Sequence, residues 1–254
     1  MSIELTSKSN EKSSSPDIVL VHGALTDASV WNAVAERLQS EGFVTIAPAL
    51  PLRGLESDAV YLSTFLDTLK GLSVLVGHSY GGSVISHPAV AKDHLQALVF
   101  VSAFLPDSGE STGELNGRWL GSQLGEATTI VRPYPGGHDL YLNPEHFAAV
   151  YAADLPPATV SLMAAAQRPI DTAALGEAFH GSPMCRSIPS WAVLSTRDRS
   201  LPIGTQRFMA KRAASSVVEI EASHATPVSQ PKAVADVIAV AARSTAGAAK
   251  STVA

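Results

Sequence analysis

The sequence predicts an α/β fold, in which a mostly parallel sheet of about six strands is flanked by helices and carries a helical cap insertion. Two observations predict the sheet: short apolar runs alternate with longer segments of helical periodicity, and each run is continuously rich in Val, Ile and Leu. Strands of a parallel sheet are buried on both faces, so their apolar residues continue without alternation. A third observation predicts the insertion, because one interval between two strands far exceeds the ~2–6 residues of an ordinary connection.

The expected strands follow one another along the chain at residues 17–22, 44–47, 73–76, 97–102, 191–195 and 217–221. Segments between them repeat apolar residues every three or four positions, which is typical of helices that dock by one face. This spacing predicts helices at residues 31–38, 59–69 and 234–241. Strands and helices in this order build one sheet that is covered on both sides.

A single domain is expected over residues 17–244. Residues 1–16 are polar and charged and lack the apolar stretch of a signal peptide, so they are interpreted as a disordered leader. Residues 245–254 are rich in small side chains and are interpreted as a flexible tail.

The insertion covers about residues 107–189 and holds eight of the 16 prolines in the chain. Proline is favoured in the first turn of a helix and aspartate at its N-cap. Short helices are therefore expected to begin at Pro144, Pro157 and Asp171.

Composition narrows the possible partners. The chain has 18 Lys and Arg against 23 Asp and Glu, a formal net charge of −5, whereas a nucleic-acid binder needs a basic face. The charge-free stretch 71–91 contains His, Ser and Gly and makes a poor membrane span. Cys185 is the only cysteine, which excludes an intrachain disulfide and a cysteine-based zinc cluster. We expect a cytoplasmic protein with no nucleic-acid or membrane partner, no metal and no cofactor, and leave a homodimer open.

Ser79 lies in the pattern Gly77-His-Ser-Tyr-Gly81, between an apolar strand and a helical segment. Small glycines let a strand turn abruptly into a helix, which exposes the serine hydroxyl above the edge of the sheet. The helix N-terminus then faces any developing oxyanion. We therefore predict that Ser79 is a nucleophile; the alternative is a glycine-rich turn that packs on the sheet.

A serine hydroxyl needs a base, and the usual base is a histidine that a carboxylate orients. Among the eight histidines, His224 follows the last strand, where a loop can return to Ser79. Asp198 ends the preceding strand and is the predicted acid. Asp107, which follows the strand before that one, is its chief competitor.

The loop after the first strand, His22-Gly23-Ala24-Leu25, can supply one backbone N–H to an oxyanion, and Tyr80 can supply a second. Gly23 has no side chain, so this loop can approach the reacting centre closely. The alternative for Gly23 is an ordinary turn glycine.

As an ordered set, five blocks of sequence resemble the α/β-hydrolase superfamily, and within it the plant methylesterase and hydroxynitrile lyase family with its bacterial esterase relatives. The blocks are 19–24 with Trp31, 75–82, 97–107, 195–202 with 206–209, and 222–224 with Pro231. The resemblance implies that Ser79, Asp198 and His224 form a catalytic triad and that Ala24 and Tyr80 are the oxyanion donors. It also implies that residues 107–189 form a cap over the pocket.

Two positions depart from the lyases in this group. The resemblance implies a threonine after the histidine of the first loop and a lysine after the catalytic histidine, but Gly23 and Ala225 stand there. A lysine charge is needed to hold departing cyanide, so lyase activity is disfavoured.

The sequence therefore predicts a serine hydrolase that cleaves small, mainly neutral carboxylic esters through an acyl-enzyme. Gly23, Phe104, Trp119 and Tyr141 are expected to contact the substrate. Hydrolysis of lactones, thioesters or C–C bonds on the same triad stays open. A non-catalytic receptor for a small ligand is the alternative of a different class, and the filled triad positions argue against it.

Overall fold

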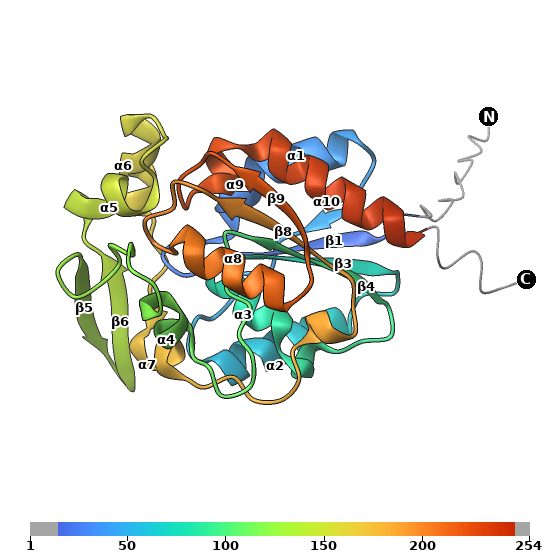
Figure 1. Ribbon diagram of the computed structural model, residues 1–254, viewed down its shortest axis with the longest axis horizontal. Coiled ribbons are helices and arrows are strands. Elements are labelled where there is room, and N and C mark those ends of the chain that lie inside the picture. Colours follow the sequence, from blue (N-terminus) through green and yellow to red (C-terminus); the bar gives the residue numbers. More distant parts are fainter. Residues whose placement is uncertain (1–14, 247–254) are drawn as a thin grey trace, which may run out of the picture.

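The computed structural model of the protein describes residues 15–246. Its centre is a six-stranded sheet in the order β2-β1-β3-β4-β8-β9, with every neighbouring pair parallel (Figure 1). The predicted α/β class is thus confirmed. The strands are β1 (Asp17–Val21), β2 (Thr45–Ile46), β3 (Ser73–His78), β4 (Leu95–Val101), β8 (Ser190–Ser195) and β9 (Ser216–Ile220).

Helices cover both faces of this sheet (Figure 1). One face carries α1 (Asn32–Ser40) and α10 (Pro231–Ala246), and the other carries α2 (Leu55–Leu66), α3 (Tyr80–Ser86) and α8 (Ile203–Arg212). Shorter helical segments are Ala28–Trp31, Pro88–Val90, Met184–Arg186 and α9 (Thr226–Ser229).

Two hydrophobic cores explain why the strand segments are apolar throughout. In β1, Ile18 and Leu20 are fully buried in the core under α1 and α10, whereas Val19 and Val21 are fully buried in the opposite core. Successive side chains of a strand point to opposite faces, so a strand between two cores needs apolar residues at every position.

The insertion lies between β4 and β8 and forms the end of the molecule at the left of Figure 1. It contains helices, as expected, but also an antiparallel sheet in the order β5-β6-β7, so the expectation of helices alone is incomplete. Its elements are α4 (Thr112–Gly117), β5 (Thr129–Tyr134), β6 (Gly137–Leu142), α5 (Pro144–Tyr151), α6 (Pro157–Ala165), β7 (Ile170–Asp171) and α7 (Thr172–Gly176).

The predicted helix starts in the insertion are confirmed. Pro144 and Pro157 each open a helix, and Asn143 caps α5 through its side chain, which accepts a hydrogen bond from Glu145 N. The carboxylate of Asp171 accepts a 2.8 Å bond from Ala173 N at the start of α7. The capping residues at these helix starts could therefore be predicted from the sequence, although the antiparallel sheet of the insertion was not predicted.

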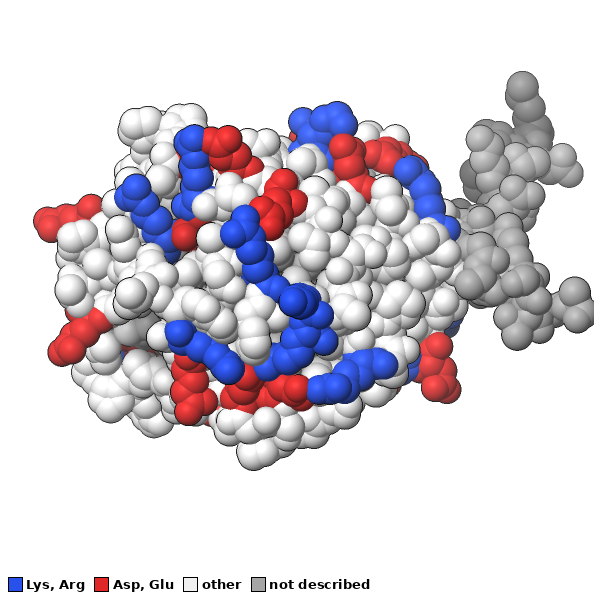
Figure 2. Space-filling model, in the orientation of Figure 1, with Lys and Arg blue, Asp and Glu red and all other residues white. Residues whose placement is uncertain are grey.

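At the C-terminal end, α10 continues to Ala246, two residues beyond the expected domain limit at 244. The remaining residues of the predicted leader and tail, 1–14 and 247–254, lie outside the described part of the chain. No helix between residues 15 and 246 is long and apolar enough to cross a membrane. The face shown in Figure 2 carries basic and acidic side chains close together. Ion pairs of the described residues include those of Arg207 with Glu219 and of Arg212 with Glu110.

Candidate active site

Ser79 occupies a sharp turn between β3 and α3, with a backbone φ of 52° and ψ of −124°. Few side chains tolerate this region, so the strain must be held in place by the surroundings. The neighbouring glycines allow it: a Cβ at Gly77 would lie 2.7 Å from Gly81 O, and one at Gly81 would lie 2.6 Å from Val21 O. The turn thus depends on the glycines of the motif, and Ser79 is held at the carboxyl edge of the sheet.

A chain of hydrogen bonds joins Ser79 to His224 and Asp198. Nε2 of His224 lies 2.8 Å from Ser79 Oγ, and Nδ1 lies 2.6 Å from Oδ2 of Asp198. All three residues are buried and follow the carboxyl ends of β3, β9 and β8. With the Nδ1 proton directed to the carboxylate, Nε2 can accept the serine proton.

Four donors hold the carboxylate of Asp198. Ser200 N and Leu201 N each donate a 2.8 Å bond to Oδ1, while Gln206 Nε2 and the His224 ring lie at 3.1 and 2.6 Å from Oδ2. Gln206 is fully buried on α8, and its role was not predicted. The carboxylate is therefore held with Oδ2 next to the His224 ring.

The competing acid, Asp107, lies elsewhere. Its carboxylate accepts a 2.5 Å bond from Arg186 and a bond from Ser108 N, and no hydrogen bond between described residues links it to His224. These contacts hold the pKa of Asp107 below its ordinary value, although its limited burial opposes them. The geometry thus favours Asp198 over Asp107.

Two further histidines support the site without entering the hydrogen-bond chain. His78 is fully buried, and its Nε2 donates a 2.9 Å bond to the backbone oxygen of His224. Burial, and to a lesser extent the nearby His224, holds the pKa of His78 well below its ordinary value, so the ring is neutral. His22 Nδ1 lies 2.8 Å from Gly23 O, and its Nε2 accepts from Leu50 N, which fixes the loop after β1.

The loop after β1 passes directly beside the turn that carries Ser79. A Cβ at Gly23 would lie 2.6 Å from Ser79 Cβ and 3.3 Å from Ser79 Oγ, so this position requires glycine. Among the hydrogen bonds of residues 15–246, none uses the backbone N–H of Ala24 or of Tyr80. Both groups border the same cavity as Ser79 and are free to bind an oxyanion.

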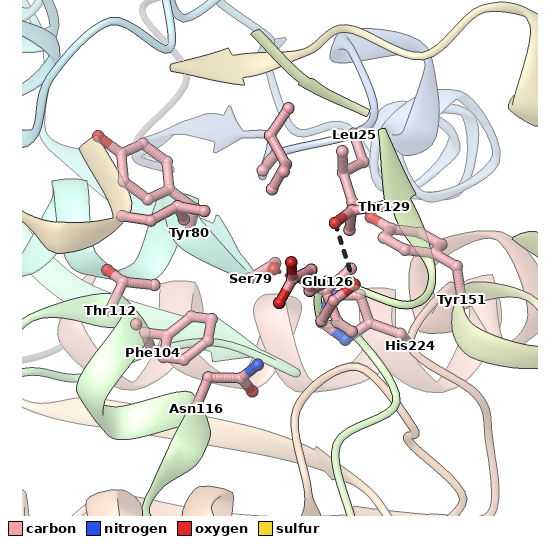
Figure 3. Close-up of a pocket in the computed structure, with 16 residues that line it drawn as sticks. Leu25, Ser79, Tyr80, Phe104, Thr112, Asn116, Glu126, Thr129, Tyr151 and His224 are labelled. Atoms are coloured by element: carbon pink, nitrogen blue, oxygen red, sulfur yellow. Dashed lines mark hydrogen bonds between the residues drawn. The ribbon is translucent and has the colours of Figure 1, made fainter. Parts of the chain in front are cut away.

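A cavity of about 290 Å³ opens above Ser79 and His224 (Figure 3). Its base comes from the core domain and includes Phe104, which was expected at the pocket. Its walls come mostly from the insertion. The lining residues are Ala24, Leu25, Ser79, Tyr80, Phe104, Thr112, Gly113, Asn116, Leu124, Gly125, Glu126, Thr129, Leu140, Tyr151, Leu175 and His224.

Gly23, Trp119 and Tyr141, which were expected to contact the substrate, are not among the residues that line this cavity. The ring of Trp119 packs against Phe208 with a centroid distance of 4.8 Å, outside the pocket. Tyr141 follows Leu140 in β6, and strand alternation turns the two side chains to opposite faces. Leu140 therefore faces the cavity, while Tyr141 lies beside the guanidinium of Arg132.

Tyr151 is a pocket residue that the sequence analysis did not assign. Its ring meets that of His224 edge to face, with the centroids 4.7 Å apart. Helix α5, which carries it, is tied to the loop of His224, because Ala225 N donates a 2.9 Å bond to Tyr151 O. Asp154, just after α5, accepts a 2.9 Å bond from Ser223 N. The insertion is thus hydrogen-bonded on both sides of His224.

Site and fold together define the class of protein. Residues 18–237 match the model of the alpha/beta hydrolase family, and the chain belongs to this family. No cluster of three or more His, Cys, Asp or Glu that could hold a metal occurs in the part of the chain that the structure describes.

Among curated proteins, the chain is similar to a pyrethroid hydrolase of Sphingobium wenxiniae, at 29% identity over 88% of this chain and 86% of that protein. It is also similar to methylesterase 8 of Arabidopsis thaliana, at 27% identity over 50% of this chain and 55% of that protein. The crystal structure of a pyrethroid hydrolase from Sphingobium faniae matches with a TM-score of 0.72 and 25% identity, covering 91% of this chain and 99% of that one. The suspected family is confirmed, and relatives named hydrolase and esterase support the predicted class of carboxylic ester hydrolase.

Proposed function

We propose that the protein hydrolyses small, mainly neutral carboxylic esters through an acyl-enzyme on Ser79. The observation that carries this proposal is the unbroken hydrogen-bond chain from Ser79 Oγ through His224 to the carboxylate of Asp198. Relatives that bear the names pyrethroid hydrolase and methylesterase support an ester as the substrate.

In the first half-reaction, Ser79 Oγ attacks the ester carbonyl carbon while His224 Nε2 takes the hydroxyl proton. Negative charge then develops on the carbonyl oxygen, which the N–H groups of Ala24 and Tyr80 stabilise, a contribution worth about 3 kcal/mol per donor. The bond to the alcohol oxygen breaks, and His224 returns its proton to the leaving alkoxide. Asp198 stabilises the transient imidazolium.

In the second half-reaction, water attacks the acyl-enzyme carbonyl and gives a proton to His224. The same two N–H groups hold the second oxyanion. The bond to Ser79 Oγ breaks, the serine recovers its proton from His224, and the carboxylic acid leaves. Atoms and charges balance with the chain's own side chains and one water molecule.

The cavity supports a small and largely apolar substrate. Its volume of about 290 Å³ is near the lower end of the usual range for small-molecule sites. Leu25, Phe104, Leu140 and Leu175 contribute to its apolar wall. A short acyl or alcohol group fits these dimensions.

A serine-directed phosphonate tests the proposal directly. We expect p-nitrophenyl esters with short acyl chains to be hydrolysed, and a fluorophosphonate to abolish turnover with one label per chain, located at Ser79 by peptide mass spectrometry. The Ser79→Ala variant should keep the wild-type unfolding temperature but lose both turnover and labelling. Wild-type turnover by that variant, or a label on another residue, would show that the nucleophile assignment is wrong.

A further inference from the structure

Glu126 is an acidic residue on the wall of an otherwise uncharged cavity. Apart from His224, it is the only lining residue among those the structure describes that carries an acidic carboxylate or a basic group. Figure 3 shows its carboxylate pointing into the cavity, on the side of Ser79. None of the hydrogen bonds and ion pairs found between residues 15 and 246 involves this carboxylate.

Three neighbouring hydroxyl groups of the lining bond to other residues and not to Glu126. The Tyr80 hydroxyl donates a 2.9 Å bond to Asp58, and the Thr129 hydroxyl donates a 3.0 Å bond to Gly125 O. The Thr112 hydroxyl pairs with Ser83 Oγ at 3.2 Å. Glu126 is itself exposed at the edge of the cavity, so water hydrates its carboxylate when the cavity is empty, and an N–H or cationic group of an occupant can replace that water.

The loop that carries Glu126 is fastened rather than free. Thr128 Oγ1 donates a 2.6 Å bond to Gln123 O, and Thr128 N donates a 2.9 Å bond to Gly125 O. Gln123 N in turn donates a 2.7 Å bond to Arg199 O, in the turn that carries Asp198. The backbone of Glu126 is thus held in place beside the turn that carries Asp198.

We propose that Glu126 determines specificity by charge: the cavity selects esters that bear a cationic nitrogen, or an N–H or O–H donor, at the end that reaches this carboxylate. This inference rests on the proposed ester hydrolysis and changes its substrate class in one respect: neutral esters with a terminal donor and cationic esters are preferred over purely apolar ones. An anionic group in the same place would lie beside a like charge, which is unfavourable, and the effect is stronger at low salt because Glu126 is exposed. Carboxylate-bearing esters are therefore rejected.

Three p-nitrophenyl esters of equal chain length test the inference: hexanoate, its 6-amino derivative and its 6-carboxy derivative. In the wild type, kcat/KM for the amino ester should exceed that for the carboxy ester at least tenfold, and high salt should reduce this ratio. The ratio should fall about tenfold in Glu126→Gln and reverse in Glu126→Lys. The matched control is Glu145→Gln, an exposed glutamate on α5 that does not line the cavity, and it should retain the wild-type ratio.

A wild-type ratio retained in Glu126→Gln and Glu126→Lys would overturn the inference while leaving the proposed hydrolysis intact. Absence of Ser79-dependent turnover of all three esters would instead count against the proposed hydrolysis. In that case the methyl amides of the three acids, bound to the wild type and to Glu126→Gln in a calorimeter, decide the matter. A Glu126-dependent preference for the amino amide supports the inference, and equal affinities overturn it.

Discussion

The hydroxyl of Tyr80, the residue after Ser79, donates a 2.9 Å hydrogen bond to the fully buried carboxylate of Asp58 on α2. Tyr80 lines the cavity (Figure 3) and carries a candidate oxyanion donor on its backbone, while its hydroxyl is held by Asp58. Asp58 also accepts a bond from Arg53 N. Burial nevertheless dominates and raises the pKa of Asp58 from 3.8 to about 6.

This raised pKa predicts a loss of stability with rising pH. The folded protein holds the Asp58 proton more tightly than the unfolded chain, so stability falls as pH rises from about 4 to about 6. The difference is worth about 3 kcal/mol in the free energy of unfolding. Urea unfolding of the wild type and of Asp58→Asn at pH 4 and at pH 7.5 measures this difference. Between the two pH values, the free energy of unfolding of the wild type should fall by about 3 kcal/mol more than that of the variant. A difference in free energy of unfolding between wild type and Asp58→Asn that stays constant across this range would contradict the prediction. Asp236→Asn, on the exposed side of α10, is the control.

Replacement of the two competing acids separates their roles. Asp198→Asn should lower kcat by about 10³- to 10⁴-fold, because the amide cannot hold His224 in the tautomer that accepts a proton at Nε2. Asp107→Asn should change kcat less than about twofold, since Asp107 pairs with Arg186 at the surface. Steady-state kinetics on one ester suffice. A larger loss in Asp107→Asn would transfer the orienting role to Asp107.

Gly23→Ala tests the close approach of the loop after β1. The added methyl group would lie 2.8 Å from His78 O as well as against Ser79, so loop and nucleophile must separate. We expect kcat/KM to fall at least 100-fold, as for loss of an oxyanion donor. Gly117→Ala is the matched control because nothing lies within 4 Å of its new methyl group, and this variant should keep full activity. A folded Gly23→Ala enzyme with wild-type kcat/KM would refute the expected contact.

Asp154→Ala probes the link between the insertion and His224. Its carboxylate holds Ser223, the residue before His224, so its removal leaves a buried donor unsatisfied and lets the loop shift. We expect kcat to fall about 10- to 100-fold with little change in KM. Circular dichroism and the unfolding temperature would reveal any wider loss of structure. Equal effects on kcat in Asp154→Ala and Asp236→Ala would argue against this link.

The parts of the site that sequence could predict are those fixed by backbone topology. Ser79, Asp198 and His224 all follow strands, and the carboxyl ends of parallel strands meet at one edge, so chain order alone brings them together. The need for glycines in the turn around Ser79 could also be predicted, since only a residue without a side chain fits there.

The cavity walls were harder to predict because they depend on which face of an element points inward. In β6 the neighbouring residues Leu140 and Tyr141 are both apolar enough to face a pocket, and only the strand register decides between them. Nothing in the sequence indicated that Glu126 lines the cavity, because an acidic residue in a loop is ordinarily a solvated surface residue.

The insertion begins after β4 and ends before β8, and these two strands are neighbours in the main sheet. They pair directly, from Leu98 with Ser190 to Val101 with Val193. Strands β4 and β8 could therefore pair in the same way with a shorter or longer segment between them, because the entropy cost of closing a loop grows only slowly with its length. Evolution can remodel or exchange the whole segment while the strands that carry the candidate catalytic groups stay paired. New substrate ranges can arise at this one junction without a new fold.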